Sequence, residues 1–170
     1  ENVQAGRIKL FGGSNWTIQR LAEANEYAKK HGKTGFTVLS NNFSLARMID
    51  PVWGGCIAAS DPESRKFLTE TQICLMPWSS QARGFFTERA GRDKKDDAEL
   101  VRFWYSDDNF ERRDRVLKMS KEKNVLPISI ALAYVLAQPF PTFPLIGPRE
   151  LRELRTSLEG VTIDLTPGTV

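Results

Sequence analysis

Short apolar runs alternate with longer amphipathic segments along the chain. Four runs have the length and composition of buried strands, and they span residues 7–11, 36–39, 73–76 and 143–146. None of them is joined to the next by a short hairpin turn. The alternation therefore predicts an α/β fold of parallel βα units, organised as a single domain over residues 1–170.

Five segments have the residue pattern of helices. They span residues 17–31, 61–70, 109–123, 127–138 and 150–158. The second has the clearest start, because Asp61 can cap a helix and Pro62 suits the first helical turn. The fourth is apolar nearly all round, so we expect it to be buried.

The connection after the third strand is long and charged. Residues 84–108 contain the run RDKKDDAE and are too many for an ordinary connection. We expect either a lid over a bound cofactor or a disordered excursion. The basic residues of this segment could meet a pyrophosphate, although a run of charges is more often a solvated face.

Composition narrows the class of protein. Hydrophobic residues make up 41% and charged residues 26% of the chain, as in ordinary globular proteins. The net charge is only +3 and the basic residues are dispersed, so nothing indicates nucleic-acid binding. No apolar run approaches the ~18 residues of a membrane span, and two cysteines make neither a disulfide framework nor a metal site. We expect a cytoplasmic protein with no metal, membrane or nucleic-acid partner.

Polar and aromatic residues follow the predicted strands. Ser14 and Asn15 come after the first strand, Ser40 after the second, and Trp78 and Ser79 after the third. Ligand sites of parallel α/β folds lie at the carboxyl ends of the strands. Trp78 could stack on a planar ring or cover the rim of the core. Ser14 and Asn15 could bind an amide group or only close a turn.

The last predicted strand leads into a candidate phosphate site. Gly147, Pro148 and Arg149 precede a helix, whose free amides and positive end attract anions. Arg149 could clamp a phosphate, or it could pair with Glu153 one turn further on. The sequence shows no Ser/His/Asp set and no other catalytic constellation.

Together these segments resemble the aldo-keto reductase family. The matching stretches, in the family's order, are RIKLFGGSNWTIQRL, NNFSLA, LMPWSSQARGFF and FPLIGPRELRELRTSL. The family folds as a (β/α)8 TIM-type barrel and reduces aldehyde or ketone carbonyls by hydride transfer from NADPH. The resemblance implies that this chain is the second half of such a barrel, with its strands five to eight.

The resemblance also implies a role for each site position. Ser14, Asn15 and Ser40 would hold the nicotinamide carboxamide, and Trp78, in place of the usual tyrosine, would stack on the nicotinamide ring. The residues along the pyrophosphate would be Ser79, Gln81, Arg83 and Gly84. The residues near the adenosine phosphate would be Gly147, Pro148 and Arg149, with Arg149 favouring NADPH over NADH. The adenine contacts would be Glu153 and Ser157.

The chain departs from the family in two ways. Ser40 and Glu153 stand where glutamine is usual, Gln81 stands where leucine is common, and the segment DPVWGGC with Trp53 is not a general family feature. Trp53 could shape a substrate or partner surface, or simply pack. In addition, the family's catalytic Asp, Tyr, Lys and His come from its first four strands, and those positions are not in this chain. We therefore expect this chain alone to be inactive.

Three interpretations stay open. The chain could be the cofactor half of a carbonyl reductase that acts on a small-molecule carbonyl substrate together with an N-terminal half. It could instead be a non-catalytic nucleotide-binding module or a self-assembling half-barrel, because a half-barrel exposes two sheet edges that a homodimer would cover. Without the resemblance, an open doubly wound sheet with an anion site is a third interpretation, and strand order decides between it and half a barrel.

Overall fold

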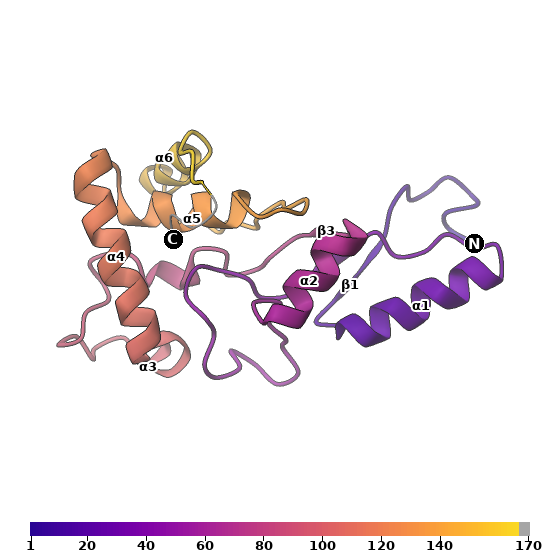
Figure 1. Ribbon diagram of the computed structural model, residues 1–170, viewed down its shortest axis with the longest axis horizontal. Helices are drawn as coiled ribbons and strands as arrows, with labels where there is room; N and C mark the ends of the chain where they lie inside the picture. The colour runs from indigo at the N-terminus through magenta and orange to yellow at the C-terminus, as the bar shows by residue number, and fades with distance from the viewer. Residues whose placement is uncertain (167–170) are drawn as a thin grey trace.

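The structure is a computed structural model, and it describes residues 1–166 (Figure 1). Strands and helices alternate in the first part of the chain, and the second part consists of helices. In chain order the elements are β1 Gly12–Ser14, α1 Ile18–Lys30, β2 Val38–Ser40, α2 Pro62–Thr71, β3 Cys74–Leu75, the 3-10 helix η1 Ala82–Gly84, α3 Ala98–Trp104, α4 Asp107–Lys123, α5 Pro127–Leu136 and α6 Leu151–Gly160. The last four residues of the predicted domain lie outside the described part.

The three strands form one parallel sheet in the order β1-β2-β3. Ser14 is paired with Ser40, and Leu39 is paired with Leu75. A doubly wound sheet reverses its strand order at a switch point, whereas the strands described here keep the order of the chain. The prediction of parallel βα units is therefore confirmed, and the strand order argues against the open doubly wound alternative.

A fourth segment runs parallel to β3, but the prediction of a strand at 143–146 is wrong in detail. Residues 141–145 make three backbone bonds to the β3 side, namely Leu75 N to Pro141 O (2.8 Å), Phe143 N to Leu75 O (2.9 Å) and Leu145 N to Pro77 O (3.0 Å). The next bond of such a ladder would start from the N–H of residue 77, which proline does not have. The ladder is consequently reduced to the single bridge between Leu75 and Thr142.

The first strand also lies later than predicted. The predicted strand 7–11 is irregular, and Leu10 is 66% exposed. The glycine pair that we expected to form a turn lies in the sheet instead. A Cβ atom on Gly12 would come within 2.2 Å of the carbonyl oxygen of Val38, so only glycine allows this approach of the two strands.

The predicted helices are confirmed, with boundaries shifted by a few residues. Capping explains their starts, because Thr17 Oγ1 accepts a hydrogen bond from Arg20 N (3.2 Å) and Asp61 Oδ1 accepts one from Ser64 N (2.8 Å). The helix α4 ends where Asn124 adopts the left-handed conformation (φ 53°), as is common at helix C-termini. No helix in the described residues is long and apolar enough to cross a bilayer.

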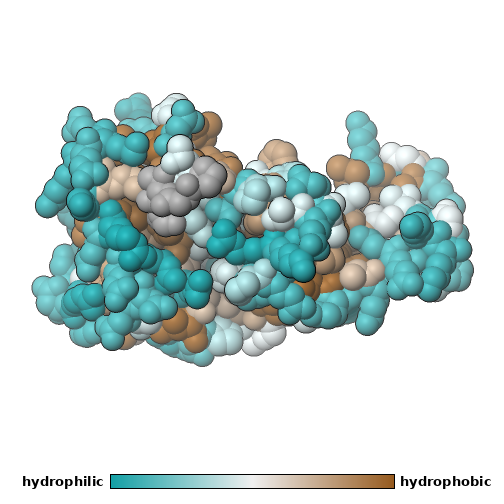
Figure 2. Space-filling model, in the orientation of Figure 1, coloured by the Kyte–Doolittle hydropathy of each residue, from teal (hydrophilic) through white to brown (hydrophobic). Residues whose placement is uncertain are grey.

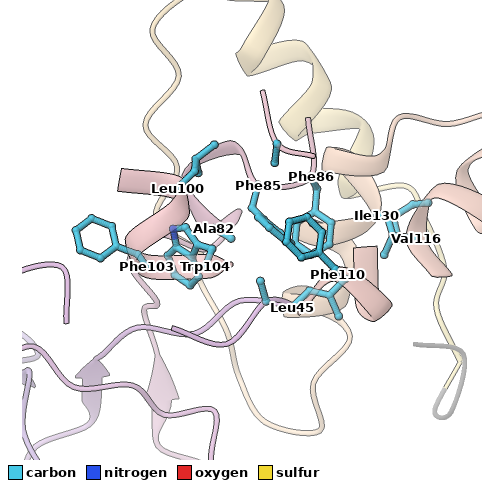
Figure 3. Packing of buried hydrophobic residues seen from close by; sticks show 13 residues of the cluster. Leu45, Ala82, Phe85, Phe86, Leu100, Phe103, Trp104, Phe110, Val116 and Ile130 are labelled. Atoms are coloured by element: carbon cyan, nitrogen blue, oxygen red, sulfur yellow. The ribbon is translucent and has the colours of Figure 1, made fainter. Parts of the chain in front are cut away.

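Residues 84–108 are packed rather than disordered. The segment contains α3, and it places Phe85, Phe86, Leu100 and Trp104 in a core where each is at most 1% exposed (Figure 3). Charged residues surround these apolar positions in the sequence, so the sequence did not predict the helix α3. The prediction of a disordered excursion is therefore wrong, and its function as a lid stays a prediction.

Two apolar clusters are joined by α5. The first contains Ile130 and Ala131 of α5 together with α3, α4 and the segment after η1, and the second contains Val135 of α5 with α1, α2 and the sheet. Tyr134 packs against both clusters. Figure 1 shows α3 to α6 gathered at one end of the molecule and α1 at the other, with α2 between them.

Candidate functional site

Four of the predicted site residues meet at the carboxyl ends of the three strands. Ser14 ends β1, Asn15 follows it, and Ser40 ends β2. The Asn15 backbone N–H donates to the Ser40 carbonyl (3.1 Å), and the indole Nε1–H of Trp78 donates to Asn15 Oδ1 (3.2 Å). The sheet therefore brings together the residues predicted to hold a carboxamide and a planar ring.

Asn15 is the centre of this group. Its Oδ1 accepts hydrogen bonds from the Trp78 indole and from the backbone N–H of Ile57, each at 3.2 Å. Two donors at one atom fix which end of the amide is oxygen. Within the described residues the Nδ2 atom makes no hydrogen bond, so a donor remains for a ligand.

The two serines present acceptors. Ser14 Oγ donates its hydrogen to the Ser40 carbonyl (3.2 Å), and Ser40 Oγ donates to the Met76 carbonyl (2.9 Å). Each hydroxyl has then used its hydrogen and keeps lone pairs. The strand ends thus offer one N–H₂ donor beside two hydroxyl acceptors, which complements a primary carboxamide.

Trp78 is half-buried but belongs to neither apolar cluster. It packs against Trp53, with the ring centroids 4.5 Å apart and the planes inclined by 36°. Both interpretations of Trp78, as a ring that stacks on a ligand and as a cover for the rim of the core, therefore stay predictions. Trp53, from the segment whose role was left open, is 48% exposed and covers a face of Trp78.

Sequence reasoning missed Asn42. This residue is fully buried, its Nδ2 donates to the Trp78 carbonyl (3.2 Å), and its backbone N–H donates to the Ile57 carbonyl (2.8 Å). The Ala59 backbone N–H donates a hydrogen bond of 2.8 Å to the Asn42 carbonyl. Asn42 thus connects the Trp53 segment to Trp78. The available signal was the Asn41-Asn42 pair directly after an apolar strand.

The turn after Trp78 is strained. Ser79, Ala82, Arg83 and Gly84 have positive φ angles of 49°, 48°, 52° and 92°, which is costly for residues other than glycine. Backbone of mixed handedness can form concavities of N–H groups that bind anions. The Arg83 guanidinium is paired with Glu99 (2.5 Å), so its charge points toward α3.

The remaining site residues form a second group beside α6. Ser157, which is buried, donates to Gln81 Oε1 (3.2 Å). The Arg149 guanidinium contacts Glu153 Oε1 (2.8 Å), and the Arg149 backbone N–H donates to Glu153 Oε2 (2.7 Å). These hydrogen bonds lower the pKa of the Glu153 carboxyl. The structure thus shows the pairing alternative for Arg149, in an exposed ion pair of the kind that contributes little to stability.

The Gly147-Pro148 turn is exposed, and space does not require its glycine. A Cβ atom on Gly147 would meet nothing within 4 Å. The two groups of the site are connected by the turn after Trp78, because Ser80 Oγ donates to the Leu145 carbonyl (2.8 Å), two residues before Gly147. The site residues therefore form one connected series, from the strand ends through the turn after Trp78 to the start of α6.

The described residues contain no metal cluster and no recognisable proton-transfer group in the site. No group of three metal-ligating side chains occurs among them. Tyr27 stacks on His31 at the end of α1, Tyr105 accepts a hydrogen bond from Gly91 N, and Tyr134 lies between the two cores. The three tyrosines described here therefore lie outside the group formed by Ser14, Asn15, Ser40 and Trp78.

The chain matches the model of a known protein family. The family model described as Aldo/keto reductase family matches residues 1–169. A probable aryl-alcohol dehydrogenase of Saccharomyces cerevisiae is 27% identical over 97% of this chain and 49% of its own length. A norsolorinic acid reductase of Emericella nidulans is 24% identical over 96% of the chain and 39% of its own length.

A solved structure has the same fold. A thermostable aldo-keto reductase in complex with the inhibitor epalrestat superimposes with a TM-score of 0.64 and 19% identity, over 99% of this chain and 48% of its own. The likeness supports a TIM-barrel-type α/β fold. The chain spans about half the length of the relatives and of the solved structure that it matches.

Proposed function

This chain belongs to the aldo/keto reductase family, and from that premise we propose that it is the NADPH-binding half of an oxidoreductase that reduces aldehyde or ketone carbonyls. The relatives whose names describe dehydrogenation of aryl alcohols or reduction of norsolorinic acid support the reaction class. They also make aromatic carbonyl compounds the first substrates to assay. In such a reaction the bound dihydronicotinamide supplies the hydride.

The observation that carries the proposal is the donor and acceptor pattern at the strand ends. Asn15 Nδ2 would donate to the carboxamide oxygen of nicotinamide, and the lone pairs of Ser14 Oγ and Ser40 Oγ would accept from the carboxamide N–H₂ group. Trp78 would provide the stacking surface for the ring. A carboxylate in place of the carboxamide would lack the N–H₂ donor, so the pattern favours nicotinamide over nicotinate.

The pyrophosphate and the adenosine end of the nucleotide would bind along the turn after Trp78 and beside α6. Ser79, Gln81, Arg83 and Gly84 lie on the strained turn, where we place the pyrophosphate. Gly147, Pro148 and Arg149 would meet the adenosine phosphate, and Glu153 and Ser157 would meet the adenine. Because the Arg149–Glu153 pair is exposed, a phosphate can replace the carboxylate as the partner of the guanidinium.

The substitution Asn15→Asp tests this function with little change of shape. Aspartate keeps an oxygen for Trp78 and Ile57 but loses the free N–H₂ donor. We expect NADPH affinity, measured by isothermal titration calorimetry on the full chain, to fall roughly 5-fold, since one hydrogen bond is worth about 1 kcal/mol. The variant should keep the wild-type melting temperature. Unchanged NADPH affinity, or no binding by the wild-type chain, would refute the proposal.

We further propose that this chain does not turn over substrate alone, because no acid or base has been identified in the site. Proton transfer would then depend on residues that pack against the chain, from an N-terminal half-barrel or a second copy. An exposed apolar face specifically favours such assembly, since Phe143, Leu158 and Val161 line one groove beside α5 and α6. Figure 2 shows hydrophobic surface at the end of the molecule where α5 and α6 lie. We place the protein in the cytoplasm, consistent with its two free cysteines.

A further inference from the structure

The segment that carries Trp53 is fixed at its base. On one side, Ile49 N donates to the Phe103 carbonyl (2.9 Å) and the Asp50 carboxylate pairs with Arg102. On the other side, Ile57 is held by Asn42 and Asn15 through hydrogen bonds of 2.8 and 3.2 Å. Val52 also packs against the first apolar cluster. These contacts place the tip, residues 53–55, at the carboxyl ends of the strands.

The tip itself has the backbone of a movable element. Gly54 and Gly55 follow Trp53, Gly55 has a φ of 81°, and a Cβ atom on either glycine would meet nothing within 4 Å. Among the residues that the structure describes, the only backbone hydrogen bond that the tip makes is a long one, from Cys56 N to the Trp53 carbonyl (3.3 Å). Trp53 can therefore change position while the anchored residues on both sides stay in place.

Trp53 meets Trp78 at the end of the sheet from which ligands reach parallel α/β folds. The segment leaves the carboxyl end of β2, and in parallel α/β folds ligands reach the sheet from that end. Residue 78 also follows the carboxyl end of its strand, β3. The Trp53 ring therefore competes for the surface of Trp78 that faces incoming ligands.

No third ring fits between the two tryptophans. Their centroids are 4.5 Å apart, whereas two rings on either side of a third are about 7 Å apart, because packed carbon atoms approach to roughly 3.5 Å. A nicotinamide ring that stacks on the covered face of Trp78 must first displace Trp53.

We propose that Trp53 determines the affinity of the nucleotide site, because it occupies the face of Trp78 on which the nicotinamide ring stacks and must leave before the ring can bind. The inference rests on the proposed function. The free chain is then divided between a covered and an open state, and the observed affinity is reduced by the fraction that is covered. The adenosine half of the nucleotide, which does not reach Trp78, is unaffected.

The experiment compares two ligands on the full chain by isothermal titration calorimetry. Trp53→Ala should bind NADPH roughly 3- to 10-fold more tightly than the wild-type chain, the range expected for losing one aromatic pair. Trp53→Phe keeps a ring and should stay near wild type. Affinity for adenosine 2′,5′-bisphosphate, which lacks the nicotinamide, should not change. Tyr27→Ala, at an exposed aromatic position on α1, is the matched control and should leave both affinities unchanged.

The outcomes separate this inference from the proposed function. Unchanged or weaker NADPH binding by Trp53→Ala, while both ligands still bind the wild-type chain, would overturn the role of Trp53 alone, since Trp53 would then support Trp78 from its other face. An equal gain for both ligands would also overturn it. Failure of every variant to bind NADPH and the bisphosphate would overturn the proposed function and this inference together.

Discussion

At the scale of single residues, one side chain connects most of the site. The Asn15 amide oxygen is shared by the Trp78 indole and the Ile57 backbone, so a single residue orients the stacking ring and anchors the Trp53 segment. The sequence placed Ser14, Asn15, Ser40 and Trp78 correctly at strand ends because that depends only on strand direction. It could not predict the Asn42 contacts or the Trp53–Trp78 contact, because both depend on a loop that returns to the sheet.

We propose that Arg149 determines nucleotide preference. We expect Arg149→Ala to weaken binding of NADPH by roughly 10-fold and to leave binding of NADH nearly unchanged, because only NADPH carries the extra phosphate that the guanidinium would bind. Competitive titration of the two nucleotides measures the ratio. Arg152→Ala removes an exposed arginine that pairs with Glu150 and serves as the control. An equal loss for both nucleotides would contradict the prediction.

At the scale of elements, local signals predicted the helices better than the strands. Asp61 and Pro62 are sufficient to start α2, because capping requires only neighbouring residues. The first strand was predicted too early in the chain, because the pair Gly12-Gly13 is typical of a turn. Only the contact with Val38 shows that this pair lies in the sheet. The predicted strand 143–146 is observed only as a single bridge, because Pro77 lacks the N–H that the next ladder bond would need. The helix α3 has only seven residues, too few for a clear apolar period.

Two helix caps predict how stability depends on pH. A backbone hydrogen bond from Leu100 and the pairing with Arg89 outweigh the effect of burial and lower the pKa of Asp97. For Asp61, burial raises the pKa, but hydrogen bonds from Ser64 outweigh this effect, so its pKa is also lowered. A carboxyl with a lowered folded pKa stabilises the fold above its unfolded pKa of about 4, and this contribution is lost as the pH falls through the folded value.

We therefore expect the melting temperature to fall between about pH 4 and pH 2. Asp97→Asn keeps a capping side chain that does not titrate, so its melting temperature should fall less steeply over this window. Asp97→Ala should lose about 1 kcal/mol at neutral pH, because the cap of α3 is gone. Circular dichroism at several pH values distinguishes the variants, and parallel curves for wild type and Asp97→Asn would show that this carboxyl has no such role.

At the scale of the whole molecule, the exposed apolar face requires explanation. Leu158 and Val161, on and after α6, are 58% and 66% exposed, and they line a groove together with Thr142 and Phe143 of the sheet edge. A surface of this kind is typical of an interface. Assembly through that side would cover these residues.

We expect native mass measurements on the purified chain to show an assembly of two copies rather than a monomer. Leu158→Lys introduces a charge at an exposed position of α6 and should shift the population toward the monomer at equal concentration, with little change in melting temperature after dissociation. Tyr27→Lys, on α1 at the other end of the molecule, should not change the mass. A compact wild-type monomer at micromolar concentration would contradict the expectation.

Because Pro77 has no N–H, one backbone hydrogen bond is missing between residue 77 and the segment 141–145. We therefore expect this segment to open locally at a different rate from the rest of the sheet. The strands β1 to β3 are held by a continuous ladder, whereas the backbone of residues 141–145 is attached to β3 and Pro77 through one bridge and a single further bond. Two side-chain bonds add to this attachment, from Ser80 Oγ to the Leu145 carbonyl and from Thr142 Oγ1 to the Val135 carbonyl. The last segment can therefore detach while the first three strands stay closed, since local openings follow the weakest set of contacts. Because this segment leads directly to Arg149, the two ends of a bound nucleotide would be released on different timescales, the adenosine end first.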